Sequence, residues 1–319
     1  MIERAFKKIA VIVPMLNEEK SLAELFIALS QQSLLPDKVI FIDAGSTDQS
    51  VEMVANWASF CSTNNKIKVI QLFNPGGAPG ENRNLGLVHA DSEWIAFLDA
   101  GISPVADWLS SLADEIEGTG QKAIFGRCFF DADTAFCKSV CAQSYGCTDM
   151  PVLPASLYHA SVFEEVGVFQ EGIRAAEDRL WMLKFDHVYG QRLNSKKVVA
   201  LYNHFPATLQ AVVKKWWMYQ KSTINSKVPD KKTWVLPLFF LIVLSGFYFS
   251  NTLGLSLVAG YFFLRGVCEP IRRSKNIFWW TQTPVALLWA PLVGLSIDVA
   301  LIGASLRHLS LRIKNALFS

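Results

Sequence analysis

The first part of the chain alternates short, continuous apolar runs with stretches whose apolar residues recur at helical spacing. The continuous runs are rich in β-branched residues, which is typical of strands buried on both faces. They lie at residues 9–14, 39–43, 68–73 and 94–99. The stretches with apolar residues every three or four positions lie at about 18–32, 49–60 and 83–89. This alternation predicts an α/β fold with a right-handed, mainly parallel sheet that helices cover on both faces.

The last quarter of the chain has a different pattern. Trp234–Leu264 contains no charged residue, and Ile277–Leu306 contains only Asp298. A hydrocarbon core of about 30 Å needs roughly 20 helical residues, so each segment is too long for one straight crossing and too short for two. Ser250 interrupts the first segment and Pro291 the second. We therefore expect two hairpins or bent re-entrant pairs, with Asp298 facing protein or lipid head groups.

Composition and charge support this division. The apolar content of 51% exceeds what a soluble core needs. Residues 1–206 hold 17 Lys and Arg against 25 Asp and Glu, whereas residues 207–319 hold 13 against 3. We expect a soluble domain at 1–206, a basic juxtamembrane segment at 207–233 and a membrane region at 234–319. The basic half suits anionic lipid head groups, and lysines directly before an apolar segment favour a membrane over nucleic acid as partner.

Positive residues flank both apolar segments. They are Lys231 and Lys232, then Arg265, Arg272, Arg273 and Lys275, then Arg307, Arg312 and Lys314. If all three groups face the cytosol, each segment returns to the side from which it entered. The N-terminus has no secretory signal pattern, so we expect the soluble domain and its cysteines to stay in the reducing cytosol, at the inner membrane. The six cysteines lack the paired spacing of zinc sites.

Polar residues follow each of the four predicted strands. They are Asn17 and Glu18, then Asp43, Ser46 and Asp48, then the loop from Asn74 to Arg83, then Asp99. In parallel sheets ligands bind beyond the carboxyl ends of the strands, so these side chains are expected to share one edge of the sheet.

These segments, in this order, resemble glycosyltransferase family 2. The matching text is VIVPMLNEE (11–19), IDAGSTDQS (42–50), NPGGAPGENRNLGL (74–87), WIAFLDAG (94–101), VFEEVGVF (162–169) and AAEDRLWML (175–183). The resemblance implies a GT-A type fold for residues 1–206, with a Rossmann-like, mixed but mainly parallel sheet flanked by helices. The apolar tail is similar to that of the membrane-attached members that build exopolysaccharide and lipid-linked saccharide, the succinoglycan-transferase type.

The resemblance also implies a donor site. Pro14, Asn17 and Glu18 match the first nucleotide-binding loop, Asp43 matches the acid that accepts the imide N–H of the base, and Arg83 matches an arginine that contacts base or phosphate. The chemistry agrees, because a carboxylate accepts an N–H from a uracil-like ring and a guanidinium donates two hydrogen bonds to phosphate.

Asp99 stands where the family has a metal-binding Asp-x-Asp motif. The resemblance implies a Mg²⁺ or Mn²⁺ ion that would bridge protein oxygens and the donor diphosphate. The text here is Asp99-Ala100-Gly101, which has one carboxylate where two are usual. His204 matches a histidine that supplies a further ligand in many relatives; a purely structural histidine is the alternative.

Glu177 and Asp178 match the family's Glu-Asp pair, in which the Asp is the general base. Inverting transfer needs a carboxylate that removes the proton of the acceptor hydroxyl. Without the resemblance, the same segment is an amphipathic helix whose acidic start suits the helix dipole. Trp181 is expected to pack in the core or to form a wall of the acceptor site.

The resemblance thus implies a metal-dependent, inverting glycosyltransferase of hexosyltransferase type. It would move a sugar from a nucleotide-diphosphate donor, UDP-linked by expectation, to a polyprenyl-diphosphate-linked saccharide at the cytosolic membrane face. Two alternatives remain open: transfer to polyprenyl monophosphate, and a degenerate membrane scaffold that binds a nucleotide sugar without turning it over.

Overall fold

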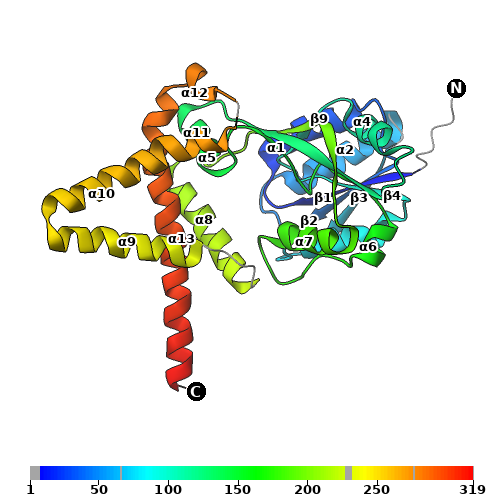
Figure 1. Cartoon of the computed structure of the whole chain (residues 1–319). Helices are drawn as coiled ribbons and strands as arrows, with labels where there is room; N and C mark the ends of the chain where they lie inside the picture. The colour runs from blue at the N-terminus through cyan, green and yellow to red at the C-terminus, as the bar shows by residue number, and fades with distance from the viewer. Residues whose placement is uncertain (1–7, 65–66, 227–231, 276, 319) are drawn as a thin grey trace. The chain divides into compact units, whose positions relative to one another are not determined.

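The computed structural model describes residues 8–64, 67–226, 232–275 and 277–318 (Figure 1). Lys231 lies outside these ranges, and the side chains of Lys232, Arg312 and Lys314 are not described. The chain forms two compact units. Unit 1 contains Met1–Phe129 and Asp149–Asn203, and unit 2 contains Phe130–Thr148 and His204–Ser319. Unit 2 therefore combines the C-terminal segment with residues that interrupt the sheet of unit 1.

Four parallel strands form one half of the sheet of unit 1. They are β1 (Ile9–Met15), β2 (Lys38–Asp43), β3 (Lys68–Phe73) and β4 (Trp94–Phe97). β1 is central, with Val11 opposite Val39 of β2 and Ala96 of β4. Because helices cover both faces, every residue from Ile9 to Val13 is buried, which explains the continuous apolar runs in the sequence.

The other half of the sheet contains antiparallel pairs. Its strands are β5 (Ser103–Pro104), β6 (Ala123–Phe130), β7 (Asp149–Pro151), β8 (Leu157–His159) and β9 (Leu193–Tyr202). The order across the sheet is β3-β2-β1-β4-β8-β6-β9-β5, and β7 pairs with β6. β8 is antiparallel to β4 and to β6. The mixed sheet that the fold prediction required is confirmed.

Helices of unit 1 cover the sheet and supply an aromatic core. They are α1 (Glu19–Ser30), α2 (Ser50–Asn64), α3 (Pro79–Ala90), α4 (Trp108–Ile116), α6 (Ser161–Glu165) and α7 (Glu177–Tyr189). Trp181 of α7 is 1% exposed and stacks on Phe163 and Phe169. Its Nε1 donates to the carbonyl of Gly167 over 2.8 Å. Of the two expectations for Trp181, packing in the core is the one observed.

Unit 2 is helical. Its elements are α5 (Ala135–Ser144), α8 (Leu209–Asn225), α9 (Lys232–Phe249), α10 (Asn251–Phe263), the π-helix η1 (Leu264–Cys268), α11 (Glu269–Arg273), α12 (Trp279–Gln282) and α13 (Val285–Phe318). α9 and α10 pack together as a hairpin, and α5, α8, α9 and η1 all contact α13 (Figure 1). α13 thus forms the axis of this unit.

The two expected interruptions of the apolar segments have different outcomes. The break at Ser250 is present, where the Ser250 hydroxyl caps α10 by accepting the N–H of Leu253. The expected break at Pro291 is wrong, because α13 runs through this residue. A Cβ atom on Gly266 would lie 2.5 Å from the Pro291 ring, so the absent side chain gives the ring its space. Within α13, Val285–Leu311 is long and apolar enough to cross a membrane.

The aromatic core yields a first prediction. Trp181→Ala leaves a large cavity among four rings and removes the hydrogen bond to Gly167, so we expect a loss of about 3–5 kcal/mol in the free energy of unfolding. Leu183→Ala, on the exposed face of the same helix, is the control and should cost less than about 1 kcal/mol. Urea unfolding followed by circular dichroism measures both; equal costs would contradict this packing.

Candidate functional site

The candidate site lies at the carboxyl ends of the parallel strands. Asp43 is the last residue of β2, Asn17 and Glu18 follow β1, and Asp99 follows β4 by two residues. α3 begins at Pro79, in the loop after β3, and carries Arg83 in its second turn. The parallel topology therefore brings four separate loops to one edge of unit 1, as the sequence predicted.

Hydrogen bonds join the loops after β1 and β2. Asn17 donates its backbone N–H to the Ser46 hydroxyl over 2.9 Å, and its side-chain oxygen accepts the N–H of Thr47 over 2.8 Å. The N–H of Glu18 donates to the Ser50 hydroxyl over 2.8 Å. Asn17 adopts a left-handed conformation with φ of 56°, which asparagine tolerates better than most residues. These side chains give the edge a fixed shape, and direct contact with a nucleotide stays a prediction for Pro14, Asn17 and Glu18.

Asp43 is buried and shapes the turn after β2. Its carboxylate accepts the backbone N–H of Gly45 over 3.0 Å and that of Ser46 over 3.1 Å. Gly45 needs its φ of +98° to make this turn. An ionised carboxylate has about four acceptor positions, so Asp43 retains capacity for one further donor such as a ring N–H.

Arg83 forms the most strongly buried polar contacts of the site. Its Nη1 donates to Oε1 of Glu177 over 2.7 Å, and its Nη2 donates to Oδ1 of Asp99 over 2.8 Å. The guanidinium, which is 3% exposed, lies over the Phe169 ring at 5.6 Å from its centroid. One buried cation thus connects α3, the loop after β4 and the first residue of α7.

The family resemblance predicts that Arg83 contacts the base or phosphate of a nucleotide. Both of its terminal nitrogens are instead paired with carboxylates, and its buried Nε has no partner among the described residues. Paired in this way, Arg83 holds Asp99 and Glu177 in position. A direct contact with base or phosphate remains a prediction.

Burial and charge act in opposite directions on this cluster. Burial alone would lower the pKa of Arg83, but the charges of Asp99 and Glu177 outweigh it and raise that pKa. Burial raises the pKa of Glu177, and the neighbouring charge of Asp178 adds to this, while Arg83 opposes it. Glu177 therefore binds its proton more tightly than a free glutamate, even beside an arginine.

α3 also fixes the loop that leads into α7. Glu81 accepts the N–H of Ala78 with one oxygen over 2.9 Å and the N–H of Gly172 with the other over 2.8 Å. Asn84 exchanges two hydrogen bonds with the backbone of Phe169, over 2.9 and 3.0 Å. A Cβ atom on Gly80 would lie 2.9 Å from the Gln170 carbonyl, so α3 approaches this loop closely only because position 80 is glycine.

Asp178 lies at the start of α7, directly after Glu177. It is half-buried, and its Oδ1 accepts the N–H of Arg179 over 2.7 Å. Ala176 precedes the helix with φ of 71°, a left-handed conformation that costs a non-glycine residue energy and is common at functional sites. The charge of Asp178 contributes to the raised pKa of Arg83, so it belongs to the same electrostatic cluster.

The metal expectation rests on Asp99. Its side chain is 44% exposed, and one of its oxygens pairs with Arg83. No group of three or more His, Cys, Asp or Glu within the described ranges is arranged to hold a metal. Mg²⁺ commonly binds through one or two carboxylates together with substrate phosphates and water, so a single exposed carboxylate fits such an ion. His204 belongs to unit 2 and is exposed, and its part in a metal site stays a prediction.

Residues 10–137 match the profile of the family described as "Glycosyl transferase family 2". This span contains β1 to β4 and the four loops that build the edge described above. The chain carries a glycosyl transferase family 2 domain.

Two curated relatives share this part of the chain. The poly(ribitol-phosphate) beta-N-acetylglucosaminyltransferase TarS of Staphylococcus aureus is 25% identical over 190 residues, which cover 56% of this chain and 32% of that protein. The GalNAc(5)-diNAcBac-PP-undecaprenol beta-1,3-glucosyltransferase of Campylobacter jejuni is 27% identical over 126 residues, which cover 40% of each. These matches span about a third and two fifths of the relatives' own length.

A solved structure supports the fold. The mannosyltransferase PcManGT from Pyrobaculum calidifontis, in complex with GDP-Man and Mn²⁺, superposes with a TM-score of 0.59 at 16% identity, over 90% of this chain and 87% of that one. At this identity the likeness establishes the architecture, which is the GT-A type.

Two residues of the site are absent from the sequence predictions. Glu81 and Asn84 hold the loop before α7, and neither is among the predicted site residues. Glu81 carried a signal, since an acidic residue in the first turn after a proline at the helix start is typical of a helix N-terminus. Asn84 carried none, because its partner Phe169 is 85 residues away in the chain.

The ion-pair geometry yields a double-mutant prediction. Arg83→Met leaves Glu177 buried without a cation and should cost about 3–5 kcal/mol of unfolding free energy. Glu177→Gln keeps a hydrogen-bond acceptor for Arg83 and should cost far less. In the double variant the cost of Arg83→Met should fall by at least about 1 kcal/mol, because no buried charge is left unpaired. Additive effects in urea unfolding would contradict this coupling.

The raised pKa of Glu177 yields a pH prediction. Since the folded chain binds this proton more tightly than the unfolded chain, the corresponding stability is complete below the ordinary pKa of 4.5 and is lost as pH rises through the folded value. Glu177→Gln cannot titrate. We therefore expect the variant to gain stability relative to the natural chain as pH rises above about 4.5. Urea midpoints of both proteins between pH 4 and 8 test this; a constant difference would contradict it.

Proposed function

We propose that the protein is an inverting glycosyltransferase that moves a sugar from a nucleotide-diphosphate donor to a saccharide carried on polyprenyl diphosphate. The observation that carries the proposal is the cluster of Arg83, Asp99, Glu177 and Asp178 on a family 2 domain. In this cluster the carboxylate of Asp99 is suited to a metal ion that would carry the donor phosphates, and the carboxylate of Asp178 is suited to remove a proton. The buried cation Arg83 holds Asp99 beside α7.

The donor end of the site is formed by the loops after β1 and β2. Asp43 retains an acceptor position suited to the imide N–H of uracil, which supports a UDP-sugar as donor. The hydrogen bonds between Asn17, Ser46 and Thr47 hold this edge before the ligand arrives, so that little ordering remains to be done on binding.

The diphosphate would lie toward Asp99. We propose that the carboxylate of Asp99, whose side chain is 44% exposed, holds a Mg²⁺ or Mn²⁺ ion together with the donor phosphates. Such an ion, when bound, offsets the negative charge that develops on the departing diphosphate. Arg83 keeps Asp99 in place through the contact of 2.8 Å.

Asp178 is the proposed general base. Its carboxylate takes the proton from an acceptor hydroxyl while that oxygen forms a bond to the anomeric carbon, and the bond from this carbon to the diphosphate oxygen breaks on the opposite face. Glu177, paired with Arg83 and buried, fixes the first turn of α7. The two adjacent carboxylates therefore have separate tasks: Glu177 positions the first turn of α7, and Asp178 removes the proton.

The named relatives support an acceptor with a hydroxyl group. By its name one acts on poly(ribitol phosphate) and the other on an undecaprenol-linked saccharide, and both are named for β products. Forming a β linkage from an α-linked sugar nucleotide is an inversion, which calls for a base such as Asp178. The apolar helices of unit 2 favour the lipid-linked acceptor and a place at the cytosolic face of the inner membrane.

The proposal predicts a loss of turnover in Asp178→Asn. Removing the base should lower kcat about 10²- to 10⁴-fold with little change in donor affinity. UDP release from UDP-hexoses, measured with Mn²⁺ and a polyprenyl-diphosphate saccharide, gives the rate. Thermal shift with the same donors gives the affinity.

Asp186→Asn is the matched control, since Asp186 lies two turns further along α7 and pairs with Arg192. It should keep its kcat. Substantial turnover by Asp178→Asn with polyprenyl monophosphate, which has no hydroxyl on a sugar to deprotonate, would count against the saccharide acceptor and against this base. No turnover by the natural chain with any donor would favour the degenerate scaffold.

A further inference from the structure

The α9–α10 hairpin exposes a continuous apolar surface. Tyr248 and Phe249, at its tip, are 88% and 75% exposed. Other large apolar side chains are exposed along its two helices: Leu238, Leu241, Ile242, Leu244, Leu253, Leu255 and Phe263. No charged residue lies between Trp234 and Leu264. An uncharged and mostly apolar surface of this kind, interrupted at the turn by the exposed Ser250, Asn251 and Thr252, is unusual for a protein in water and indicates a lipid contact.

The hairpin is too short to cross a bilayer. α10 continues through η1 and α11 to Arg273, but its uncharged part, residues 251–264, spans only about 21 Å, and α9 has 18 residues, which span about 27 Å. The hydrocarbon core is about 30 Å thick. The turn is nonetheless suited to an apolar environment, because the Ser250 hydroxyl accepts the N–H of Leu253 and the Ser250 carbonyl accepts that of Gly254. The hairpin therefore fits one leaflet, which it enters and leaves on the same side.

α13 exposes an apolar stripe along its length. Its members are spaced three, four or seven residues apart and are Val285, Leu288, Leu292, Val299, Leu306 and Leu309. The opposite face is covered, with Ala290, Val293, Ile297 and Ala300 buried. Because α5 and α8 cover the opposite face, only the outward stripe of α13 is free to contact lipid.

Two helices, α5 and α8, cover that opposite face of α13. Gln143 of α5 donates to the carbonyl of Ala290 over 2.8 Å, and Gln220 of α8 donates to the Ser305 hydroxyl over 3.2 Å. These two contacts lie 15 residues apart on α13, about 22 Å. A perpendicular crossing would therefore draw α5 or α8 into the hydrocarbon. α8 carries the exposed Lys214 and Lys221, whose burial in lipid is costly.

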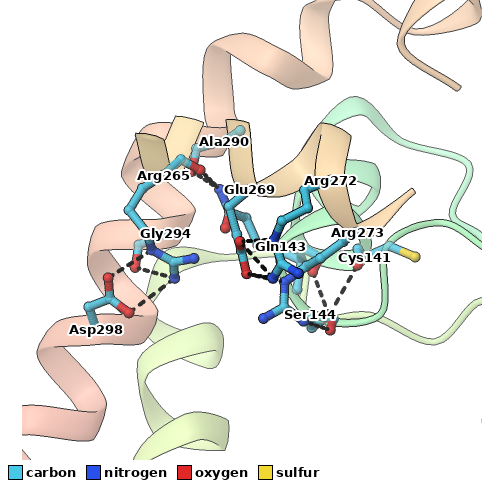
Figure 2. A network of polar contacts seen from close by, with 11 residues as sticks. Cys141, Gln143, Ser144, Arg265, Glu269, Arg272, Arg273, Ala290, Gly294 and Asp298 are labelled. Atoms are coloured by element: carbon cyan, nitrogen blue, oxygen red, sulfur yellow. Dashed lines mark hydrogen bonds and ion pairs between the residues drawn. The ribbon is translucent and has the colours of Figure 1, made fainter. Parts of the chain in front are cut away.

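A buried ion pair fixes the base of the hairpin on α13 (Figure 2). Arg265 of η1 donates to both oxygens of Asp298, over 2.8 and 3.0 Å, and Tyr261 donates to the same carboxylate over 2.9 Å. In Figure 1 the hairpin extends from one side of α13, while α5 and α8 lie on the other side. α13 and the hairpin thus lie across one another, so that both cannot run along the membrane normal.

From these observations we infer that unit 2 binds a lipid bilayer from one side only: the α9–α10 hairpin enters one leaflet, α13 lies along the surface, and no helix of the described residues crosses. The partner is a bilayer with anionic head groups, since the exposed Lys214, Lys221, Arg272 and Arg307 suit such lipids. The inference rests on the membrane attachment in the proposed function and is independent of the sugar chemistry.

Labelling from one side of the membrane tests this. In the full chain with Cys137 and Cys268, the two cysteines that are not buried, replaced by serine, single cysteines are introduced as Lys214→Cys on α8 and Ser310→Cys near the end of α13. A membrane-impermeant maleimide should label both from the same side of sealed vesicles. Tyr248→Cys, carrying a fluorophore, should be quenched by brominated lipids. Labelling of positions 214 and 310 from opposite sides would show that α13 crosses and would overturn the inference.

A binding measurement completes the test. Tyr248→Asp/Phe249→Asp places two charges at the tip without touching a core, and should weaken flotation with phosphatidylglycerol-containing vesicles at least tenfold. Val88→Asp, on the exposed face of α3, is the control and should bind as the natural chain does. If the natural chain fails to bind vesicles and instead forms a lipid-independent dimer through the hairpin, both the inference and the proposed membrane attachment are wrong. Opposite-side labelling alone leaves the proposed transferase intact.

Discussion

The buried contact of Arg83 with Asp99 and Glu177 is the interaction on which the geometry of unit 1 depends. It joins three segments that are separate in the chain: α3, the loop after β4 and the start of α7. A buried guanidinium is stable only when its donors are paired, and two carboxylates at 2.7 and 2.8 Å meet most of that need. The negative charges of Asp99 and Glu177 can lie close together because the guanidinium of Arg83 is paired with both and offsets their repulsion.

The contact with Arg83 also explains why the adjacent acids Glu177 and Asp178 differ in burial. Glu177 is buried against Arg83 and Gly80, whereas Asp178 is half-buried and one position further along α7. The left-handed Ala176 sets the direction in which the helix begins, and Glu81 and Asn84 hold the loop before it. A strained residue of this kind persists only where its surroundings fix it, and α3 supplies those contacts.

The sequence predicted those features whose cause is local. The buried strands, the helix starts and the polar residues at the carboxyl ends of the strands follow from periodicity and turn chemistry, and the structure has them at nearly the predicted residues. The partners of Arg83 lie 16 and 94 residues away, so no local pattern announces them. Pro291 shows the same limit: α13 continues through this proline, and the ring packs against Gly266, which is 25 positions away and has no side chain, so no local pattern announces the contact.

Unit 2 repeats the physical solution found in unit 1. Arg265 pairs with the buried Asp298, and the π-helix η1 interrupts the regular α-helical turn at this arginine. Two hydrophobic residues of similar volume would pack at least as stably, because a buried pair recovers little more than its desolvation costs. What the pair adds is a directional contact that fixes η1 and the end of α10 on α13. A hairpin whose outer surface is mostly apolar needs such a directional contact at its base, and the only acid between Ile277 and Leu306 lies where it accepts hydrogen bonds from Arg265 and Tyr261.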